Sequence, residues 1–134
     1  MKNPFKPSGF DTHIGPGFSI SGDVFVPPNS INVIDGEVTG RTLCVDKSTE
    51  GVDSSKTIVM IGGKVRMADT IEVPNITVTG WLSVDKMIVA GTLALEKNGR
   101  IEAKEISYGS LHIQPNATII GNLKKIGDKD GDSN

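Results

Sequence analysis

The chain has 134 residues, enough for one domain with one elongated core, and its formal net charge of −2 excludes a broad attraction to nucleic acid. Its aliphatic residues include 15 Ile and 12 Val against 6 Leu and 5 Ala, a bias that favours strands and excludes a mainly helical fold. No apolar run is long enough to cross a membrane, no secretory signal is visible and the single Cys44 cannot form an internal disulfide, so we expect a cytoplasmic protein.

Residues 1–13 contain two Pro and one Gly without any periodicity, which predicts a flexible N-terminal tail. Within it, Phe5 and Phe10 stand near Lys2 and Lys6. Aromatic rings can enter a membrane interface while lysines meet anionic headgroups, so the tail is predicted to contact an anionic membrane surface. The alternative is that the two Phe side chains pack on the first coil or make no contact.

One short pattern recurs across residues 14–126, in which an apolar residue, a Gly and a second apolar residue alternate with other residues. It occurs at 20–26, 34–40, 61–67 and 78–84, and more loosely at 95–103 and 113–121. The second apolar residues are separated by 14, 27, 17, 19 and 18 positions; they are Val24, Val38, Val65, Leu82, Ile101 and Ile119. Strand patterns at a near-constant period predict a β-solenoid of about six coils, about 29 Å long.

Two of these separations depart from the near-constant period. The longest contains residues 46–56, which are almost wholly polar and are predicted to form a loop inserted into one coil. The shortest comes first, which predicts a short first coil, with Phe18 beside the open end of the core.

Alternation along each strand assigns side chains to its two sides. The predicted inward set is Ile20, Val24, Ile34, Val38, Leu43, Val45, Ile61, Val65, Ile71, Val73, Val78, Leu82, Ile88, Leu95, Ile101, Ile106, Ile113 and Ile119. The predicted outward set is Asp23, Asp35, Glu37, Lys64, Arg66, Glu72, Thr77, Thr79, Arg100 and Glu102.

Residues that could carry catalysis are sparse. His13 and His112 lie near opposite ends of the predicted rod, which excludes a three-histidine zinc site within one chain. No nucleophile motif or carboxylate pair stands out, so we predict no enzyme, catalytic residue, cofactor or metal. Cys44 is predicted to be a small buried apolar residue, and Trp81 to point outward, toward a protein contact or a Lys stem.

Residues 127–134 are predicted to form a solvated acidic tail. Asp128, Asp130 and Asp132 resemble the start of a calcium loop, but Ser133 stands where such a loop needs Gly.

The sequence contains no capping helix at either end of the predicted solenoid. Uncovered ends act as templates for pairing, so the chain is expected to assemble end to end into a homopolymer. The predicted self-association residues are Phe18, Ile20, Leu111, Ile113, Ile119, Ile120, Leu123 and Ile126.

Four segments carry a resemblance to a known family. They are Ile-Ser-Gly-Asp-Val at 20–24, Ile-Asp-Gly-Glu-Val-Thr-Gly at 34–40, Gly-Arg-Ile-Glu-Ala at 99–103 and Leu-His-Ile-Gln-Pro-Asn-Ala-Thr-Ile-Ile-Gly at 111–121. They resemble bactofilins, bacterial polymer-forming cytoskeletal proteins, and the similarity covers about residues 14–126. The resemblance implies a right-handed parallel β-helix, nucleotide-independent assembly into non-polar filaments, and scaffolding at the cytoplasmic membrane, often for cell-wall enzymes or other envelope proteins.

Three features depart from the family's pattern: the insertion at 46–56, the replacement of repeat glycines, as at Met67, Val84, Ala103 and Ala117, and the C-terminal Lys124-Lys125-Ile126. Two other functions remain as alternatives. A hexapeptide-repeat acyltransferase or γ-class carbonic anhydrase would keep aliphatic residues at six-residue spacing, which from Ile14, Ile20 and Val26 fails at Asn32. A carbohydrate-binding β-helix would cluster aromatic and carboxylate residues on one face, whereas aromatics are 4% of this chain and scattered.

Overall fold

A computed structural model describes residues 12–17, 19–46 and 55–126. This part of the chain forms strands and no helix. The strands are β1 (Thr12–Ile14), β2 (Ser19–Ser21), β3 (Val24–Val26), β4 (Ile31–Ile34), β5 (Glu37–Val45), β6 (Ile58–Ile61), β7 (Lys64–Val73), β8 (Asn75–Val78), β9 (Trp81–Leu95), β10 (Arg100–Ile113) and β11 (Thr118–Lys125).

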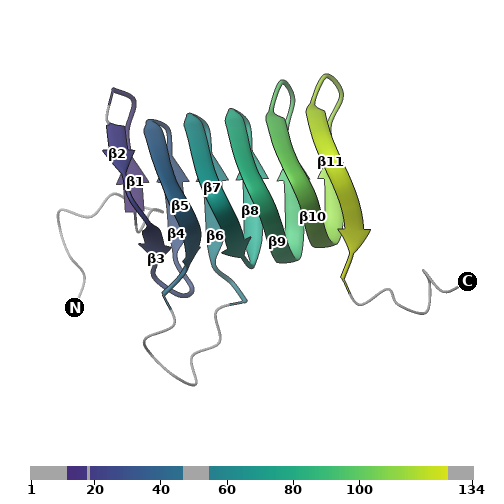
Figure 1. Cartoon of the computed structure of the whole chain (residues 1–134), viewed down its shortest axis with the longest axis horizontal. Helices are drawn as coiled ribbons and strands as arrows, with labels where there is room; N and C mark the ends of the chain where they lie inside the picture. The colour runs from purple at the N-terminus through teal and green to yellow at the C-terminus, as the bar shows by residue number, and fades with distance from the viewer. Residues whose placement is uncertain (1–11, 18, 47–54, 127–134) are drawn as a thin grey trace, which may run out of the picture.

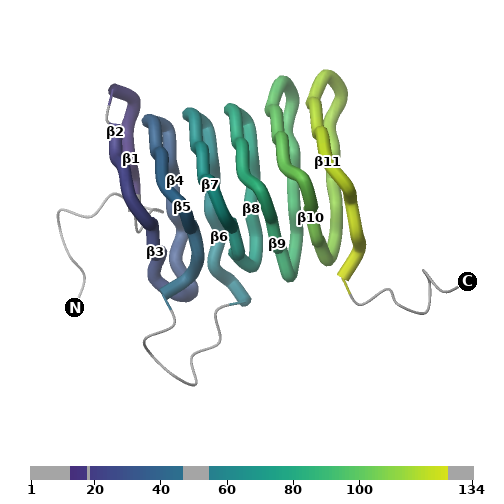
Figure 2. Tube along the Cα trace, viewed as in Figure 1, coloured from purple at the N-terminus to yellow at the C-terminus, as the bar shows by residue number. Residues whose placement is uncertain are grey.

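The strands wind into a parallel β-solenoid of about six coils (Figure 1). The long strands run downward at the front and β4, β6 and β8 run upward behind them, while the chain advances from left to right. The winding is therefore right-handed, and the Cα trace in Figure 2 follows the same path. The predicted right-handed parallel β-helix is confirmed.

Each coil contributes one strand segment to each of three faces, which we name A, B and C and define by their residues. Face A contains β1, β4, β6, β8, residues 92–95 and residues 110–113. Face B contains β2 and residues 37–40, 64–67, 81–84, 100–103 and 118–120. Face C contains β3 and residues 42–45, 70–73, 86–89, 105–108 and 122–125.

The core consists of inward-facing aliphatic columns that run along the axis, because parallel in-register coils place equivalent residues directly above one another. In the four middle coils these side chains are between 0% and 1% exposed. The face A column is Ile34, Ile61, Val78 and Leu95; the face B column is Val38, Val65, Leu82 and Ile101; the face C column is Leu43, Ile71, Met87 and Ile106.

The predicted inward set is right for most of its residues and wrong for Ile88. Ile88 faces outward and is half-buried, while its neighbours Met87 and Val89 are completely buried. Residues 87–90 are all apolar, so alternation could not identify the inward side of this strand. The buried residues that the prediction omitted include Val26, Val59, Met67, Ile76, Val84, Met87, Val89 and Leu93.

The predicted short first coil is also wrong. Val24 does not occupy the column of Val38: it pairs with Leu43 on face C, whereas Ile20 pairs with Val38 on face B. Two consecutive strands of the first coil, β2 and β3, carry similar apolar patterns. The sequence pattern therefore assigns Val24 on β3, instead of Ile20 on β2, to the column of Val38. Between Ile20 and Val38 the spacing is 18 residues, within the range of 17 to 19 that follows the insertion.

The corner between face A and face B brings successive coils into close contact. A Cβ atom added to Gly63 would overlap the carbonyl oxygen of Gly36, and one added to Gly80 would overlap that of Gly63. In the last two coils a longer turn replaces this tight corner, with Asn98 and Asn116 at φ 68° and 67°. Asn tolerates this left-handed conformation, which accounts for the looser sequence pattern of the last two repeats.

Polar side chains hold the C-terminal end of the insertion between β5 and β6. Asn75 donates from Nδ2 to the carbonyl oxygens of Ser55 at 2.9 Å and Thr57 at 3.0 Å. On the preceding coil, the backbone N of Asn29 donates to Oγ1 of the fully buried Thr57 at 2.7 Å. Residues 47–54, most of the predicted loop, lie outside the described residues.

Candidate self-association surfaces

Within the described residues, part of the core is exposed at the N-terminal end, on the first coil. Ile20 on β2 begins the face B column and is 40% exposed, although Val38 beside it is 1% exposed. Ile14 and Val24, which begin the other two columns, are half-buried. The first side chain of each column is therefore more exposed than the side chains of the middle coils, because a neighbouring coil packs on it from one side only.

On the last coil of the described chain, part of the core is exposed in the same way. Ile113 ends the face A column at 46% exposure, and Leu123 ends the face C column at 43%. Ile119, which ends the face B column, is half-buried. Covering such partly exposed aliphatic side chains contributes about 1 kcal/mol each, so a surface that meets several of them gains appreciably from contact.

The backbone of the terminal strands pairs on one side only within the described strands. At the N-terminal end β1 pairs with β4 while β2 and β3 pair with β5, and at the C-terminal end β11 pairs with β10. Strand edges with free N–H and C=O groups accept another strand readily. Each end therefore combines exposed core with hydrogen-bonding groups that a second solenoid can satisfy.

The structure places the predicted self-association residues at different depths. Ile20, Ile113, Ile119 and Leu123 end core columns, and Leu111 is half-buried beside them on face A. Ile120 points outward on face B at 49% exposure, and Ile126 follows β11 and donates its backbone N–H to Tyr108 O at 2.6 Å. Phe18 lies outside the described residues.

Sequence reasoning missed Phe25, the most exposed of the large apolar residues described, at 59%. It lies on β3, in the first coil, between the inward-facing Val24 and Val26. The alternation of Val-Phe-Val with the Pro pair after it could have identified it as an outward aromatic residue on a terminal strand.

A charged residue interrupts the core at the C-terminal end. Lys125 pairs with Tyr108, which pairs in turn with the buried Val89, so Lys125 occupies a core-facing position. Any contact that covers this end must leave the Lys125 ammonium group in water or provide it with an acceptor.

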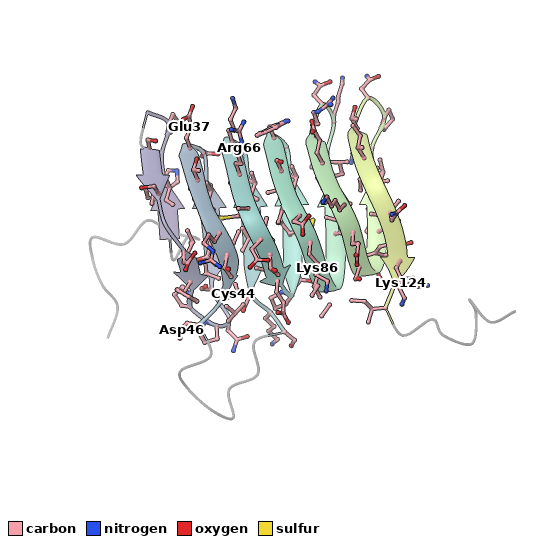
Figure 3. All side chains as sticks on the ribbon, viewed as in Figure 1. Glu37, Cys44, Asp46, Arg66, Lys86 and Lys124 are labelled. Carbon is pink, nitrogen blue, oxygen red and sulfur yellow. The ribbon has the colours of Figure 1, made fainter. Side chains whose placement is uncertain are left out.

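Trp81 and Cys44, two outward residues whose side chains could bind a partner or react, are both half-buried. The Trp81 ring is half-buried on face B, with Lys64 Nζ 5.4 Å and Arg66 Cζ 5.2 Å from its centroid, so the ring contacts the charged ends of a Lys and an Arg side chain. Cys44 faces outward on face C and is half-buried, so its predicted burial is wrong (Figure 3).

The two histidines lie apart. His13 Nε2 lies 3.3 Å from Asp35 Oδ2, and His112 is exposed on the last coil. Among the residues that the structure describes, no group of three or more His, Cys, Asp or Glu side chains could hold a metal ion.

The predicted membrane-contact residues Lys2, Phe5, Lys6 and Phe10 lie outside the described residues. In the described part of the chain, no helix is long and apolar enough to span a membrane.

Comparison with known proteins identifies one family. The family described as "Bactofilin: Polymer-forming cytoskeletal" matches residues 12–124, from the first strand almost to the end of the last. No curated protein and no solved structure matches. The match includes both terminal coils, where the core is uncovered, and it agrees with the resemblance of the repeats. The chain belongs to the bactofilin family of polymer-forming cytoskeletal proteins.

Proposed function

We propose that this chain is a structural scaffold that polymerises end to end, without nucleotide, by joining the terminal coils of successive copies. The observation that carries the proposal is the exposure of the core at both ends, with Ile20 at 40% and Leu123 at 43%, against 0% to 1% in the same columns of the middle coils. Membership of a polymer-forming family supports self-association. The proposed role is mechanical and organisational, without catalysis.

The first experiment is electron microscopy of the purified full chain without nucleotide or added metal. We expect filaments from the unmodified protein. Ile20→Arg and Leu123→Arg each place a charge at one end of the core and are expected to shorten or abolish filaments while leaving the circular dichroism of the solenoid unchanged. Thr39→Arg, at an exposed outward position of the second coil on face B, is the matched control and should form normal filaments.

Filaments of normal length in both end variants would contradict the proposal. Loss of filaments in the control as well would show that added positive charge disrupts assembly wherever it is placed.

We also propose that the filaments lie at the cytoplasmic membrane through residues 1–11. The support is compositional, because Phe5 and Phe10 stand near Lys2 and Lys6 in a segment that precedes the first strand. Removing residues 1–11 is expected to preserve filaments and reduce co-sedimentation with vesicles that contain anionic phospholipid. Lys2→Ala with Lys6→Ala tests the electrostatic part alone, and unchanged binding after the deletion would contradict the membrane role.

A filament at the membrane can position cell-envelope or shape-determining proteins, including cell-wall enzymes, and we propose this as the cellular role. The support is family membership together with the repeated outward surface that a filament would present. Cross-linking in intact cells, followed by identification of the attached proteins, tests it. Envelope proteins should be recovered with the unmodified chain and be depleted with Leu123→Arg, whereas equal recovery from both would contradict a role for the polymer.

A further inference from the structure

The last coil of the solenoid carries two positive charges and no negative charge within the described residues. Between residues 114 and 126 the only Asp, Glu, Lys or Arg side chains are Lys124 and Lys125, and both are exposed. The ion pairs of the described chain involve other side chains on earlier coils. In register, the two lysines pair with Ser107 and Tyr108, which bring no carboxylate to them. This end of the solenoid is therefore basic (Figure 3, where Lys124 is labelled).

Lys125 also occupies a core-facing position. The inward residues before it on face C are Val45, Val73 and Val89, which are between 0% and 4% exposed. Tyr108, the next residue of this column, is half-buried and packs against the core. Lys125 follows Tyr108 in register and ends the column. Within the described last coil, it is thus the one charged group that faces the core.

This placement matters when the end of the solenoid is covered. Burying an ammonium group without a partner costs much more free energy than covering one partly exposed aliphatic side chain returns. The family resemblance implies that equivalent ends meet, which brings Lys124 and Lys125 of two copies into one junction and adds repulsion between like charges. A stable contact at this end therefore needs a source of negative charge. The first coil has no such need, because residues 12–28 contain no Lys or Arg.

The acidic segment at residues 127–134 is the nearest source of negative charge along the chain. It begins two residues after Lys125 and contains three Asp and one Lys, a side-chain charge of −2 that equals in size the +2 of Lys124 and Lys125. Its acidic residues are Asp128, Asp130 and Asp132. An extended chain advances roughly 3.4 Å per residue, so these carboxylates can reach either lysine of their own copy, or of a facing copy about 4.8 Å away. The segment lies outside the described residues.

We propose that residues 127–134 bind Lys124 and Lys125 and supply the carboxylates that allow a second copy to cover the C-terminal end of the core. The segment has no apolar side chain, so it leaves Ile113 and Leu123 to be covered by the second copy. Its role is that of a counter-charge and not of a cap. The inference rests on the proposed end-to-end assembly and adds to it a requirement at one of the two ends.

The first arm of the test removes the negative charges. Asp128→Asn, Asp130→Asn and Asp132→Asn are combined in the full chain, which keeps the size of each side chain. Sedimentation velocity at low salt, where charges are least screened, measures the protein concentration at which polymers form. The triple variant should need a concentration at least about tenfold higher than the unmodified chain, because an ammonium that is buried without its partner strongly opposes the contact.

The matched control removes the same number of carboxylates from exposed positions on the second, third and fourth coils. It combines Glu37→Gln, Asp69→Asn and Asp85→Asn. This control should assemble at the same concentration as the unmodified chain. Loss of assembly in the control would assign the effect to net charge and overturn the inference.

The second arm removes the positive charge instead. Lys125→Leu continues the aliphatic column, so adding it to the triple variant should restore assembly at the concentration of the unmodified chain. Ser107→Leu, at an outward position of face C on the preceding coil, adds the same group to the surface and should not restore it. Rescue by Lys125→Leu alone distinguishes a counter-charge from a general effect of the segment on folding or solubility.

Three further results would overturn the inference. Assembly of the triple variant at the ordinary concentration would show that the carboxylates are not needed, and easier assembly would show that the segment obstructs this end. Failure of Lys125→Leu to restore assembly would show that the carboxylates act on another group. In all three cases the unmodified chain still polymerises and the proposed function stands. If the unmodified chain forms no polymer, the proposed function fails and this inference with it.

Discussion

At the scale of single residues, Arg100 and Glu102 on β10 form an ion pair at the surface of the solenoid. Nε of Arg100 donates a hydrogen bond to Oε2 of Glu102 at 2.6 Å. This bond and the nearby positive charge lower the pKa of the Glu102 carboxyl below its ordinary value of 4.5, and Trp81 adds a further hydrogen bond. Both partners are largely exposed, so the pair contributes little to stability.

The lowered pKa of Glu102 determines how its contribution to stability changes with pH. A carboxyl whose pKa is lowered by folding stabilises the fold above pH 4.5, and this contribution is lost as pH falls through the lowered pKa. Arg100→Gln should return the pKa of Glu102 toward its ordinary value, measured by NMR titration of the Glu102 side-chain carbon. Lys104→Gln, on the same strand but paired with Asp85 at 3.6 Å, should leave it unchanged. An unaltered pKa in Arg100→Gln would contradict this cause.

Gly63 tests how closely the coils are stacked. A Cβ atom there would overlap the carbonyl oxygen of Gly36 on the preceding coil, and neither backbone can move without separating neighbouring strands. Gly63→Ala is therefore expected to lower the free energy of unfolding by about 2–4 kcal/mol. Thermal unfolding in an Ile20→Arg, Leu123→Arg background measures this without assembly. Thr39→Ala serves as the surface control, and equal stability of both would contradict the close contact.

At the scale of elements, side-chain hydrogen bonds fix the C-terminal end of the insertion between β5 and β6. The Asn75 amide joins three segments by bonding to Ser55, Thr57 and Thr92. The polar run at 46–56 predicted the position of the insertion, but no local signal indicated that Asn75, on the next coil, holds its end.

Asn75→Ala should therefore loosen this corner. Three hydrogen bonds are lost and leave partly buried groups unpaired, so the expected destabilisation is about 2–3 kcal/mol. Hydrogen exchange should accelerate at the amide of Thr92, which donates to Asn75. Thr92→Ala keeps the backbone donor and should leave exchange nearly unchanged. Uniform acceleration across all coils in Asn75→Ala would indicate global rather than local loosening.

The fold could be predicted from the sequence because each coil repeats the same alternation, and its period appears directly in the spacing of Val65, Leu82, Ile101 and Ile119. Positions lacking alternation could not be assigned. Ile88 lies in an apolar run, and the first coil carries two similar strands, so Val24 was placed in the wrong column. The end residues Ile20, Ile113 and Leu123 were predictable from their place in the repeat, whereas the core-facing position of Lys125 became visible only once the register aligned it with Tyr108.

At the scale of the whole molecule, the core of the described solenoid is buried in the middle coils and partly exposed at both ends. The middle coils bury their aliphatic columns almost completely, and the same columns are partly exposed in the first and last coils. A repeating fold has no internal reason to stop, so another copy can continue the columns at either end. These partly exposed ends are the structural support for the proposed end-to-end polymerisation.

Sedimentation velocity of the two end variants tests this claim most directly. The family resemblance implies a non-polar filament, in which equivalent ends pair. Ile20→Arg and Leu123→Arg each keep one intact end, so on that assembly each variant should stop at dimers. The unmodified chain and Thr39→Arg should form long polymers, and the double variant Ile20→Arg, Leu123→Arg should be monomeric. Long polymers of the double variant would contradict assembly through the terminal coils.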